Sequence, residues 1–224
     1  MMDKEKLTEL IDYTLLSPVA SKEIIKTFCL EAITHGFRTV FVNPWYVPYA
    51  YTILSPHGIK VGAPIGFSLG GASTRVKVEE TKAAIEDGAS EIDMLVNLGA
   101  VKSREFNAVY QDIDAVVRAV GGLTTKVILE TSLLNLAEKR EVTEIVMAAG
   151  ADFVKTATGF NGGGATVEDI ELLSNISQGK IGVKAAGGIR TYEDAVKMIE
   201  AGATRIGASG AVAIIQNRKS KADY

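Results

Sequence analysis

The sequence has few of the side chains that most often bind metals or form disulfides. Its 224 residues include one cysteine, Cys29, and two scattered histidines, His35 and His57. A lone cysteine makes neither an intramolecular disulfide nor a thiolate metal cluster. Two scattered histidines make neither a metal site nor a catalytic triad. We therefore expect no metal and no cofactor, and any catalysis should rely on other side chains.

Long apolar runs and strong net charge are missing as well. No stretch approaches the roughly 20 apolar residues that span a bilayer. A formal net charge of −3 provides no electrostatic reason to expect nucleic acid or anionic membrane as a partner. The opening "MMDKEKLTELIDYTLL" lacks the apolar core and small residues of a cleavable secretory signal. We therefore expect a cytoplasmic protein that binds neither nucleic acid nor membranes.

A repeated helix–glycine–strand pattern is present instead. It occurs in the segments "THGFRTVFVNP", "EDGASEIDMLVN", "AAGADFVKTAT" and "EAGATRIGAS". In each segment a glycine can adopt the left-handed conformation that ends a helix, and a short apolar strand follows. With four further candidates, eight strands are predicted to begin near residues 11, 38, 60, 91, 126, 152, 181 and 205.

The stretches between these strands have helical patterns. Ser21 is a plausible N-cap, another helix is expected to begin at Ser103, and Thr166 and Thr191 each open a Thr-x-x-Asp sequence similar to a capping box. Strands that alternate with single helices favour a parallel (β/α)₈ barrel, here with an extra N-terminal helix. An open doubly wound sheet is the alternative. No linker divides the chain, so one domain over residues 1–224 is expected, with a flexible tail from about residue 217.

Two of the predicted strands contain a lysine among apolar residues. Lys155 lies in "DFVKTATGF" and Lys184 in "GVKAAGGIR". Because strand side chains alternate between faces, both lysines should point into the barrel, together with Asp93 of "EIDMLVN". A lysine in a strand more often marks a solvated edge, but a closed barrel has no edge and buried charges are usually paired or functional.

The two lysines suggest imine chemistry. A free lysine is neutral about 0.04% of the time at pH 7. A second ammonium about 6 Å away, at an effective dielectric constant near 20, costs roughly 2.8 kcal/mol and lowers the pKa by about two units. We assign imine formation to Lys155, pKa tuning to Lys184 and proton relay to Asp93. The chemistry implied is a metal-independent aldol reaction.

Glycine-rich turns follow the last two strands, where this barrel commonly binds phosphate. Gly187 and Gly188 allow close approach of backbone amides to an anion, and Ser209, Gly210 and Ala211 offer further amides. A phosphorylated aldehyde or ketose is therefore the expected substrate. Two other hypotheses share this feature: a phosphate-binding isomerase or synthase on the same barrel, and a non-catalytic sugar-phosphate sensor.

The motifs together resemble a known family, deoxyribose-phosphate aldolase. They are "IDYTLL", "VNP", "GFSLGG", "EIDMLVNLGAVKS", "FVKTATGF" and "GVKAAGGIRTYEDA", which extend over nearly the whole chain. Phe41 departs from the pattern, because the family often has cysteine before "VNP". The resemblance implies a cytoplasmic class I lyase of deoxyribonucleotide catabolism that reversibly cleaves 2-deoxy-D-ribose 5-phosphate to acetaldehyde and D-glyceraldehyde 3-phosphate.

The resemblance also implies roles for particular residues. It supports Lys155 as the Schiff-base lysine, with Lys184 beside it and Asp93 as the proton-relay carboxylate. It places four further residues near the substrate: Asp12, Thr14, Thr158 and Gly159. The family commonly ends in tyrosine, so Tyr224 is a candidate proton shuttle, with a frayed terminus as the alternative. A homodimer or homotetramer is expected.

Overall fold

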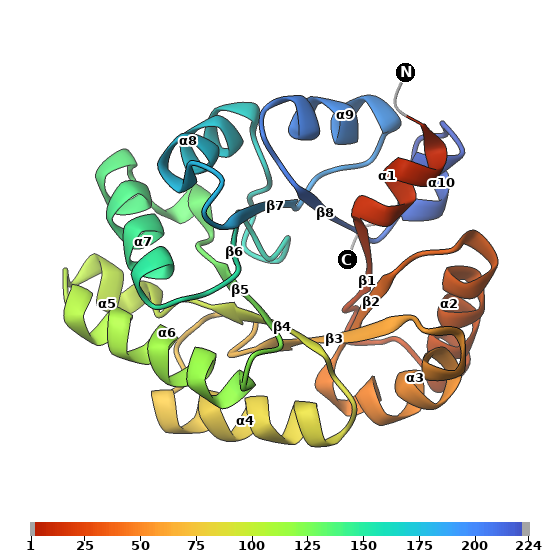
Figure 1. Cartoon of the computed structure of the whole chain (residues 1–224), viewed down its shortest axis with the longest axis horizontal. Coiled ribbons are helices and arrows are strands. Elements are labelled where there is room, and N and C mark those ends of the chain that lie inside the picture. Colours follow the sequence, from red (N-terminus) through yellow and green to blue (C-terminus); the bar gives the residue numbers. More distant parts are fainter. Residues whose placement is uncertain (1–2, 221–224) are drawn as a thin grey trace.

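The computed structural model describes residues 3–220, which form a closed barrel of eight parallel strands (Figure 1). The strands follow chain order, and β1 pairs with both β2 and β8. The predicted (β/α)₈ fold is therefore confirmed, and the open sheet is wrong. The strands are β1 (Ile11–Leu15), β2 (Thr39–Val42), β3 (Lys60–Ile65), β4 (Glu91–Leu95), β5 (Thr124–Ile128), β6 (Phe153–Lys155), β7 (Gly182–Ala186) and β8 (Arg205–Ala208).

Helices surround the barrel, and the expected extra helix, α1, precedes β1 (Figure 1). The α-helices are α1 (Lys4–Leu10), α2 (Lys22–His35), α3 (Val47–Leu54), α4 (Thr74–Glu86), α5 (Leu98–Lys102), α6 (Phe106–Val120), α7 (Leu136–Ala148), α8 (Val167–Ser177), α9 (Tyr192–Glu200) and α10 (Ala211–Ile215). Three short 3₁₀ helices lie in the connections: η1 (Pro44–Tyr46), η2 (Ser55–His57) and η3 (Thr131–Leu133).

Helix boundaries largely follow the predicted signals. Ser21 caps α2 by accepting a hydrogen bond from the backbone N–H of Ile24, and Thr191 forms a capping box with Asp194 at the start of α9. The prediction of a helix beginning at Ser103 is wrong. Ser103 ends α5, and Arg104 then has a φ of 59°, so the long helix α6 begins only after it. That left-handed residue breaks the helical path.

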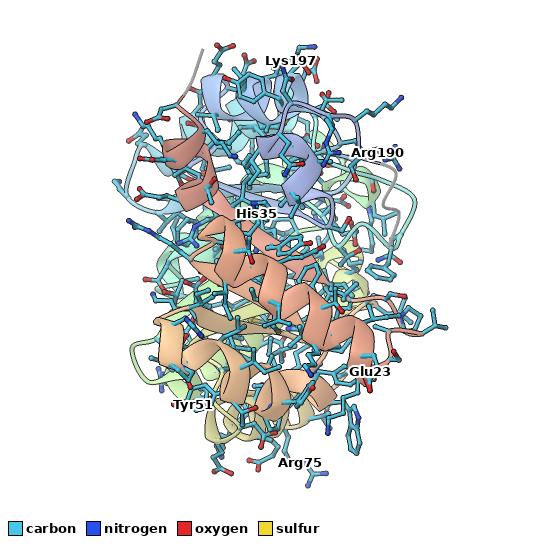
Figure 2. All side chains as sticks on the ribbon, turned by 90° about the vertical axis from the view of Figure 1, so that its right-hand side faces the viewer. Glu23, His35, Tyr51, Arg75, Arg190 and Lys197 are labelled. Atoms are coloured by element: carbon cyan, nitrogen blue, oxygen red, sulfur yellow. The ribbon has the colours of Figure 1, made fainter. Side chains whose placement is uncertain are left out.

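Alternating strand faces divide the interior into two parts. Ile92, Met94, Val154 and Val183 belong to the apolar core between the barrel and its helices. Helix α2 contributes its buried face to this core and crosses the outer surface between Glu23 and His35 in Figure 2. The other face of each strand points to the barrel axis, where the charged side chains lie.

A buried ion pair ties two outer helices to one barrel strand. Lys77 of α4 is fully buried and donates to Asp112 of α6 at 2.5 Å and to the carbonyl of Leu95 at 2.9 Å. Because Leu95 ends β4, this lysine anchors the strand that carries Asp93. Within residues 3–220, no helix is sufficiently long and apolar to cross a membrane.

The described chain ends just after α10. Its last described residue, Ser220, is buried, and its backbone N–H donates to the carbonyl of Arg190 at 2.9 Å. Residues 221–224 of the predicted tail, with Tyr224, lie outside the described residues.

Candidate active site

Neighbouring strands bring the predicted catalytic residues together inside the barrel. Lys155 ends β6 and pairs in register with Lys184 of β7, while Asp93 lies on β4. The ammonium nitrogens of Lys155 and Lys184 lie 2.8 and 2.7 Å from the same oxygen, Oδ2 of Asp93. They are therefore at most about 5.5 Å apart. Asp12 of β1 joins them, with its Oδ2 at 2.6 Å from Lys184 Nζ.

The barrel holds a third lysine that the sequence interpretation missed. Lys126 of β5 is fully buried, and its Nζ lies 2.5 Å from Glu91 and 3.1 Å from Asp93. Arg205 of β8 completes the group by binding Asp12 at 2.7 Å. The signal was available, because "KVILE" places a lysine among apolar residues as Lys155 and Lys184 are placed. We call these seven side chains the charge cluster: Asp12, Glu91, Asp93, Lys126, Lys155, Lys184 and Arg205.

The aromatic ring of Phe41 contacts the side-chain nitrogens of two of the lysines. Its ring centroid lies 4.1 Å from Lys184 Nζ and 4.6 Å from Lys126 Nζ. An aromatic face attracts a desolvated cation, and the ring offers this attraction to both nitrogens. The residue that departs from the family pattern thus lies within the site.

Lys155 differs electrostatically from Lys126. Burial, opposed by Asp93 and reinforced by the charges of Lys184 and Lys126, lowers the pKa of Lys155 to about 8. Burial also acts on Lys126, but Asp93, Asp12 and Glu91 outweigh it and raise the pKa of Lys126. Lys155 therefore has the larger share of neutral amine near neutral pH.

The two aspartates of the charge cluster are held in their ionised form. Both are completely buried, which opposes ionisation. The surrounding cations outweigh that effect and lower the pKa of Asp93 and of Asp12 well below the usual range. At neutral pH both carboxylates are therefore ionised. They accept hydrogen bonds from the lysines that they contact, and any proton passed to them is released again.

Accessibility also distinguishes Lys155 from the other two lysines. Its exposed fraction is 5%, whereas Lys126 and Lys184 are at 0%. Lys155 is also the last residue of its strand, so its side chain is nearest to the carboxyl end of the barrel, where this fold places its active sites.

A cavity of about 500 Å³ lies at the same end of the barrel. It brings together three of the predicted phosphate-site residues, Gly159, Gly188 and Ser209, with Arg190 as a cationic neighbour. The predicted residues Gly187 and Gly210 are not in its lining, nor are Thr14 and Thr158. Thr14 is buried and donates its hydroxyl to the carbonyl of Asp12.

The loops after β6 and β7 form one wall of this cavity by direct backbone contact. A Cβ atom added at Gly164 would lie 2.6 Å from the carbonyl oxygen of Gly187, and one at Gly187 would lie 2.9 Å from Gly164 Cα. Only glycine allows such an approach, and at Gly187 the φ of 90° requires it too. The amide of Ala165 donates to the carbonyl of Gly187 at 3.0 Å across this contact.

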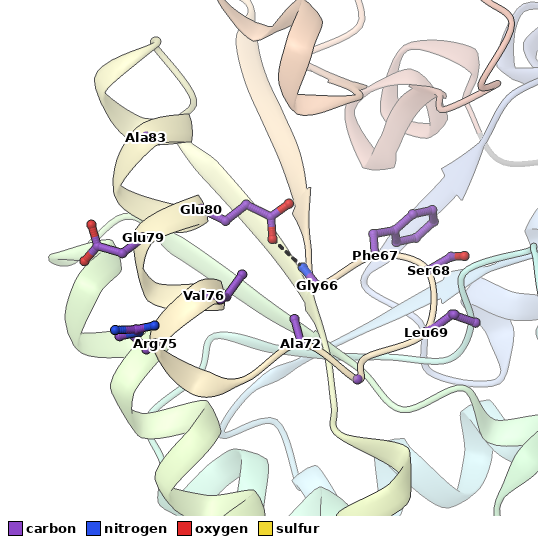
Figure 3. A pocket seen from close by; sticks show the side chains of 11 residues that line it. Gly66, Phe67, Ser68, Leu69, Ala72, Arg75, Val76, Glu79, Glu80 and Ala83 are labelled. Carbon is purple, nitrogen blue, oxygen red and sulfur yellow. Dashed lines mark hydrogen bonds between the residues drawn. The ribbon is translucent and has the colours of Figure 1, made fainter.

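A second cavity, of about 1360 Å³, lies away from the lysines. Figure 3 shows it between α4 and the loop after β3, where Glu80 accepts a hydrogen bond from the amide of Gly66. None of the lysines that we predicted to be catalytic lines it. In the part of the chain that the structure describes, no group of three or more His, Cys, Asp and Glu side chains is arranged to hold a metal ion.

Comparison with known proteins places the chain among aldolases. Residues 10–216 match the family model described as DeoC/LacD family aldolase. Deoxyribose-phosphate aldolase 2 of Oceanobacillus iheyensis is 61% identical over 223 residues, which cover 100% of both chains. A crystal structure of a putative deoxyribose-phosphate aldolase from Coccidioides immitis has a TM-score of 0.94 and 43% identity over 96% of this chain and 86% of that one. The tetrameric deoxyribose phosphate aldolase from Aeropyrum pernix has a TM-score of 0.90 and 35% identity over 96% and 91%.

Proposed function

The chain belongs to the DeoC/LacD family of aldolases, and from this membership we propose that it reversibly cleaves 2-deoxy-D-ribose 5-phosphate through a lysine Schiff base. It is an aldolase, a carbon–carbon lyase. The products of the proposed reaction are acetaldehyde and D-glyceraldehyde 3-phosphate. The observation that carries the mechanism is the contact of Lys155 and Lys184 with the same carboxylate oxygen of Asp93, at 2.8 and 2.7 Å, with Lys155 the most accessible lysine of the charge cluster. Burial, opposed by Asp93, also lowers the pKa of Lys155 to about 8.

The first half of the proposed reaction forms the imine. The neutral amine of Lys155 attacks the C1 aldehyde of the open-chain sugar, and the resulting carbinolamine loses water to give an iminium ion. Asp93, hydrogen-bonded to Lys155, relays one proton from the nitrogen to the oxygen as the carbinolamine forms, and a second proton, taken from solvent, lets that oxygen leave as water. The charge of Lys184, which also contacts Asp93, lowers the pKa of Lys155 and so disfavours a second positive charge there.

The second half breaks the carbon–carbon bond. The C3 hydroxyl gives its proton to water through the relay by Asp93, the C2–C3 bond breaks, and the electron pair of that bond moves toward the iminium nitrogen to give an enamine. Glyceraldehyde 3-phosphate departs with the new carbonyl at the former C3. Protonation of the enamine at C2 and addition of water then release acetaldehyde and the free amine of Lys155.

The phosphate end of the substrate fits the 500 Å³ cavity. Gly159, Gly188 and Ser209 from three loops line it, and Arg190 adds a cation. Backbone amides and a guanidinium are groups that bind phosphate oxygens. We assign Gly187 and Gly210 to the backbone turns that shape this cavity, and Asp12 and Thr14 to the support of the reacting end. Thr158, the residue before Gly159 in the loop after β6, we assign to the positioning of that loop.

Borohydride trapping tests the proposal. Reduction in the presence of acetaldehyde should add the mass of an ethyl group to the protein at Lys155, mapped by peptide mass spectrometry, and the unmodified protein should cleave 2-deoxyribose 5-phosphate. Cleavage without an adduct at Lys155 would contradict the imine mechanism. Binding of the sugar phosphate without turnover would instead favour the sensor hypothesis, and isomerisation without cleavage would favour an isomerase.

The proposed role of Lys155 predicts a pH dependence. At pH 7 a lysine with a pKa of about 8 is neutral in roughly a tenth of molecules; this fraction rises about tenfold per pH unit well below the pKa and reaches about a half at the pKa. We therefore expect kcat/KM for cleavage to rise between pH 6 and pH 8 and then to level off. Initial rates across this range check the expectation, and a profile that falls over the same interval would contradict it.

The wider setting follows from the same family membership. We propose a cytoplasmic role in deoxyribonucleotide catabolism, with small molecules as the partners of the site and neither nucleic acid nor membrane bound. A homodimer or homotetramer is proposed because the related aldolase from Aeropyrum pernix is tetrameric. Light scattering of the purified protein distinguishes the two assemblies.

A further inference from the structure

Glu130 is a buried carboxylate outside the charge cluster. Glu130 is the second residue after the end of β5, and its side chain is fully buried. Its backbone is left-handed, with a φ of 56° and a ψ of 62°. A left-handed backbone is unfavourable for a residue with a Cβ atom, and burial is unfavourable for a carboxylate. A residue keeps such an unfavourable conformation only where the surrounding structure holds it in place. Residues of this kind cluster at functional sites.

Neutral donors from the loop after Lys155 surround this carboxylate. The backbone N–H of Thr158 donates to it at 3.1 Å, and the hydroxyl of Thr158 at 2.5 Å. The side-chain amide of Asn161 donates to the same oxygen as that hydroxyl, at 2.8 Å. Thr158 Oγ1 in turn accepts from the N–H of Phe160 at 3.0 Å. Glu130 thereby orders four consecutive residues, 158–161.

The same contacts join loops from three strands. Asn161 Nδ2 also donates to the carbonyl of Ser68 at 2.8 Å, and Ser68 lies on the loop after β3 drawn in Figure 3. At its other end the loop is fastened by the hydrogen bond from Ala165 to Gly187. The loop from Thr158 to Ala165 includes Gly159 and residues 162–164, all of which line the 500 Å³ cavity.

We propose that Glu130 is a positioning residue that holds the loop after β6 so that its backbone faces the phosphate group of the substrate. This inference rests on the proposed function, because it concerns recognition of the phosphorylated end of that substrate. Glu130 itself touches neither the substrate nor Lys155. It acts through Thr158 and Asn161, and its loss should weaken binding of the phosphate end while leaving the lysine chemistry intact.

Glu130→Gln tests the hydrogen bonds of Glu130 most directly, because this substitution hardly changes the size and shape of the side chain. Glutamine keeps the shape, but one of its two terminal groups is a donor. That NH₂ group would meet donors from Thr158 or Asn161 and could not accept from them. We expect KM for 2-deoxyribose 5-phosphate to rise about tenfold, which corresponds to the loss of about one net hydrogen bond. Asn161→Ala, in a half-buried position, should raise KM by roughly threefold.

Two readouts separate positioning from a general structural role. Cleavage of unphosphorylated 2-deoxyribose should keep its kcat/KM within about twofold, and borohydride trapping of acetaldehyde at Lys155 should be unchanged. Asp112→Asn, which alters another buried carboxylate away from the site, should lower the melting temperature without raising KM.

The proposal is overturned if KM for the phosphorylated sugar is unchanged in folded Glu130→Gln, or if cleavage of both sugars falls equally. If Glu130→Gln does not fold, Asn161→Ala decides by the same two comparisons. An unmodified protein that cleaves neither sugar would contradict the proposed function, whereas an active one with insensitive variants contradicts only the role of Glu130.

Discussion

Replacing Lys155 with methionine should abolish the aldolase reaction, with kcat reduced on the order of 10⁴-fold or more. Loss of a covalent nucleophile removes the low-barrier route altogether, and effects of this size or larger accompany such losses in other enzymes. Methionine retains an unbranched apolar chain of similar length, so the largely buried position remains filled. Cleavage of 2-deoxyribose 5-phosphate and the mass increment after borohydride reduction with acetaldehyde measure the effect.

The matched control is Lys26→Met, which removes an exposed lysine from α2. It should retain full turnover and the adduct at Lys155. Circular dichroism of Lys155→Met should show a folded barrel, because Asp93 still contacts Lys184 and Lys126. Substantial turnover by a folded Lys155→Met would refute its role as the nucleophile and direct attention to Lys184.

Replacing Lys184 with leucine should lower turnover about 100-fold at pH 7 and move the activity profile toward alkaline pH. Two ammonium groups about 5.5 Å apart repel by about 3 kcal/mol at an effective dielectric constant near 20, or about two pKa units. Without Lys184 this repulsion disappears, and Asp93 interacts more strongly with Lys155. Both changes raise the pKa of Lys155, so less neutral amine is present at pH 7.

The pH profile distinguishes this tuning role from damage to the fold. The inflection expected at about pH 8 in the unmodified enzyme should lie near pH 10 in Lys184→Leu. Lys77→Met removes another fully buried lysine, one that pairs with Asp112 away from the charge cluster. It should lower the melting temperature and leave the inflection in place. An unmoved inflection in Lys184→Leu would show that burial and Lys126 lower the pKa of Lys155 without Lys184.

The roles of the two lysines stay a proposal, and the cause of the pKa shift at Lys155 needed the structure. Sequence reasoning attributed the shift mainly to Lys184. In the folded chain burial is the largest cause, Asp93 opposes it, and Lys126 adds to Lys184. The net effect of such opposing terms depends on distances and burial, and alternation along a strand supplies neither quantity.

Residues that support the site were harder to predict than those that perform the chemistry. Lys126 has the same local pattern as Lys155 and could have been found from it. Glu130 could not, because its partners Thr158 and Asn161 are about thirty residues away. Arg104 illustrates a third limit, since its left-handed backbone moves a helix start that Ser103 indicated.

The sequence by itself determined the barrel, the inward direction of Lys155, Lys184 and Asp93, and the kind of reaction that two buried lysines suggest. These features follow from local periodicity and from the cost of burying charge, which act along a few residues. Only the tertiary structure decided how the seven charges pair and what lowers the pKa of Lys155, the nucleophile that the sequence had already suggested. These properties depend on how burial and the clustered charges combine at one nitrogen, and they arise only when eight strands close around a common axis.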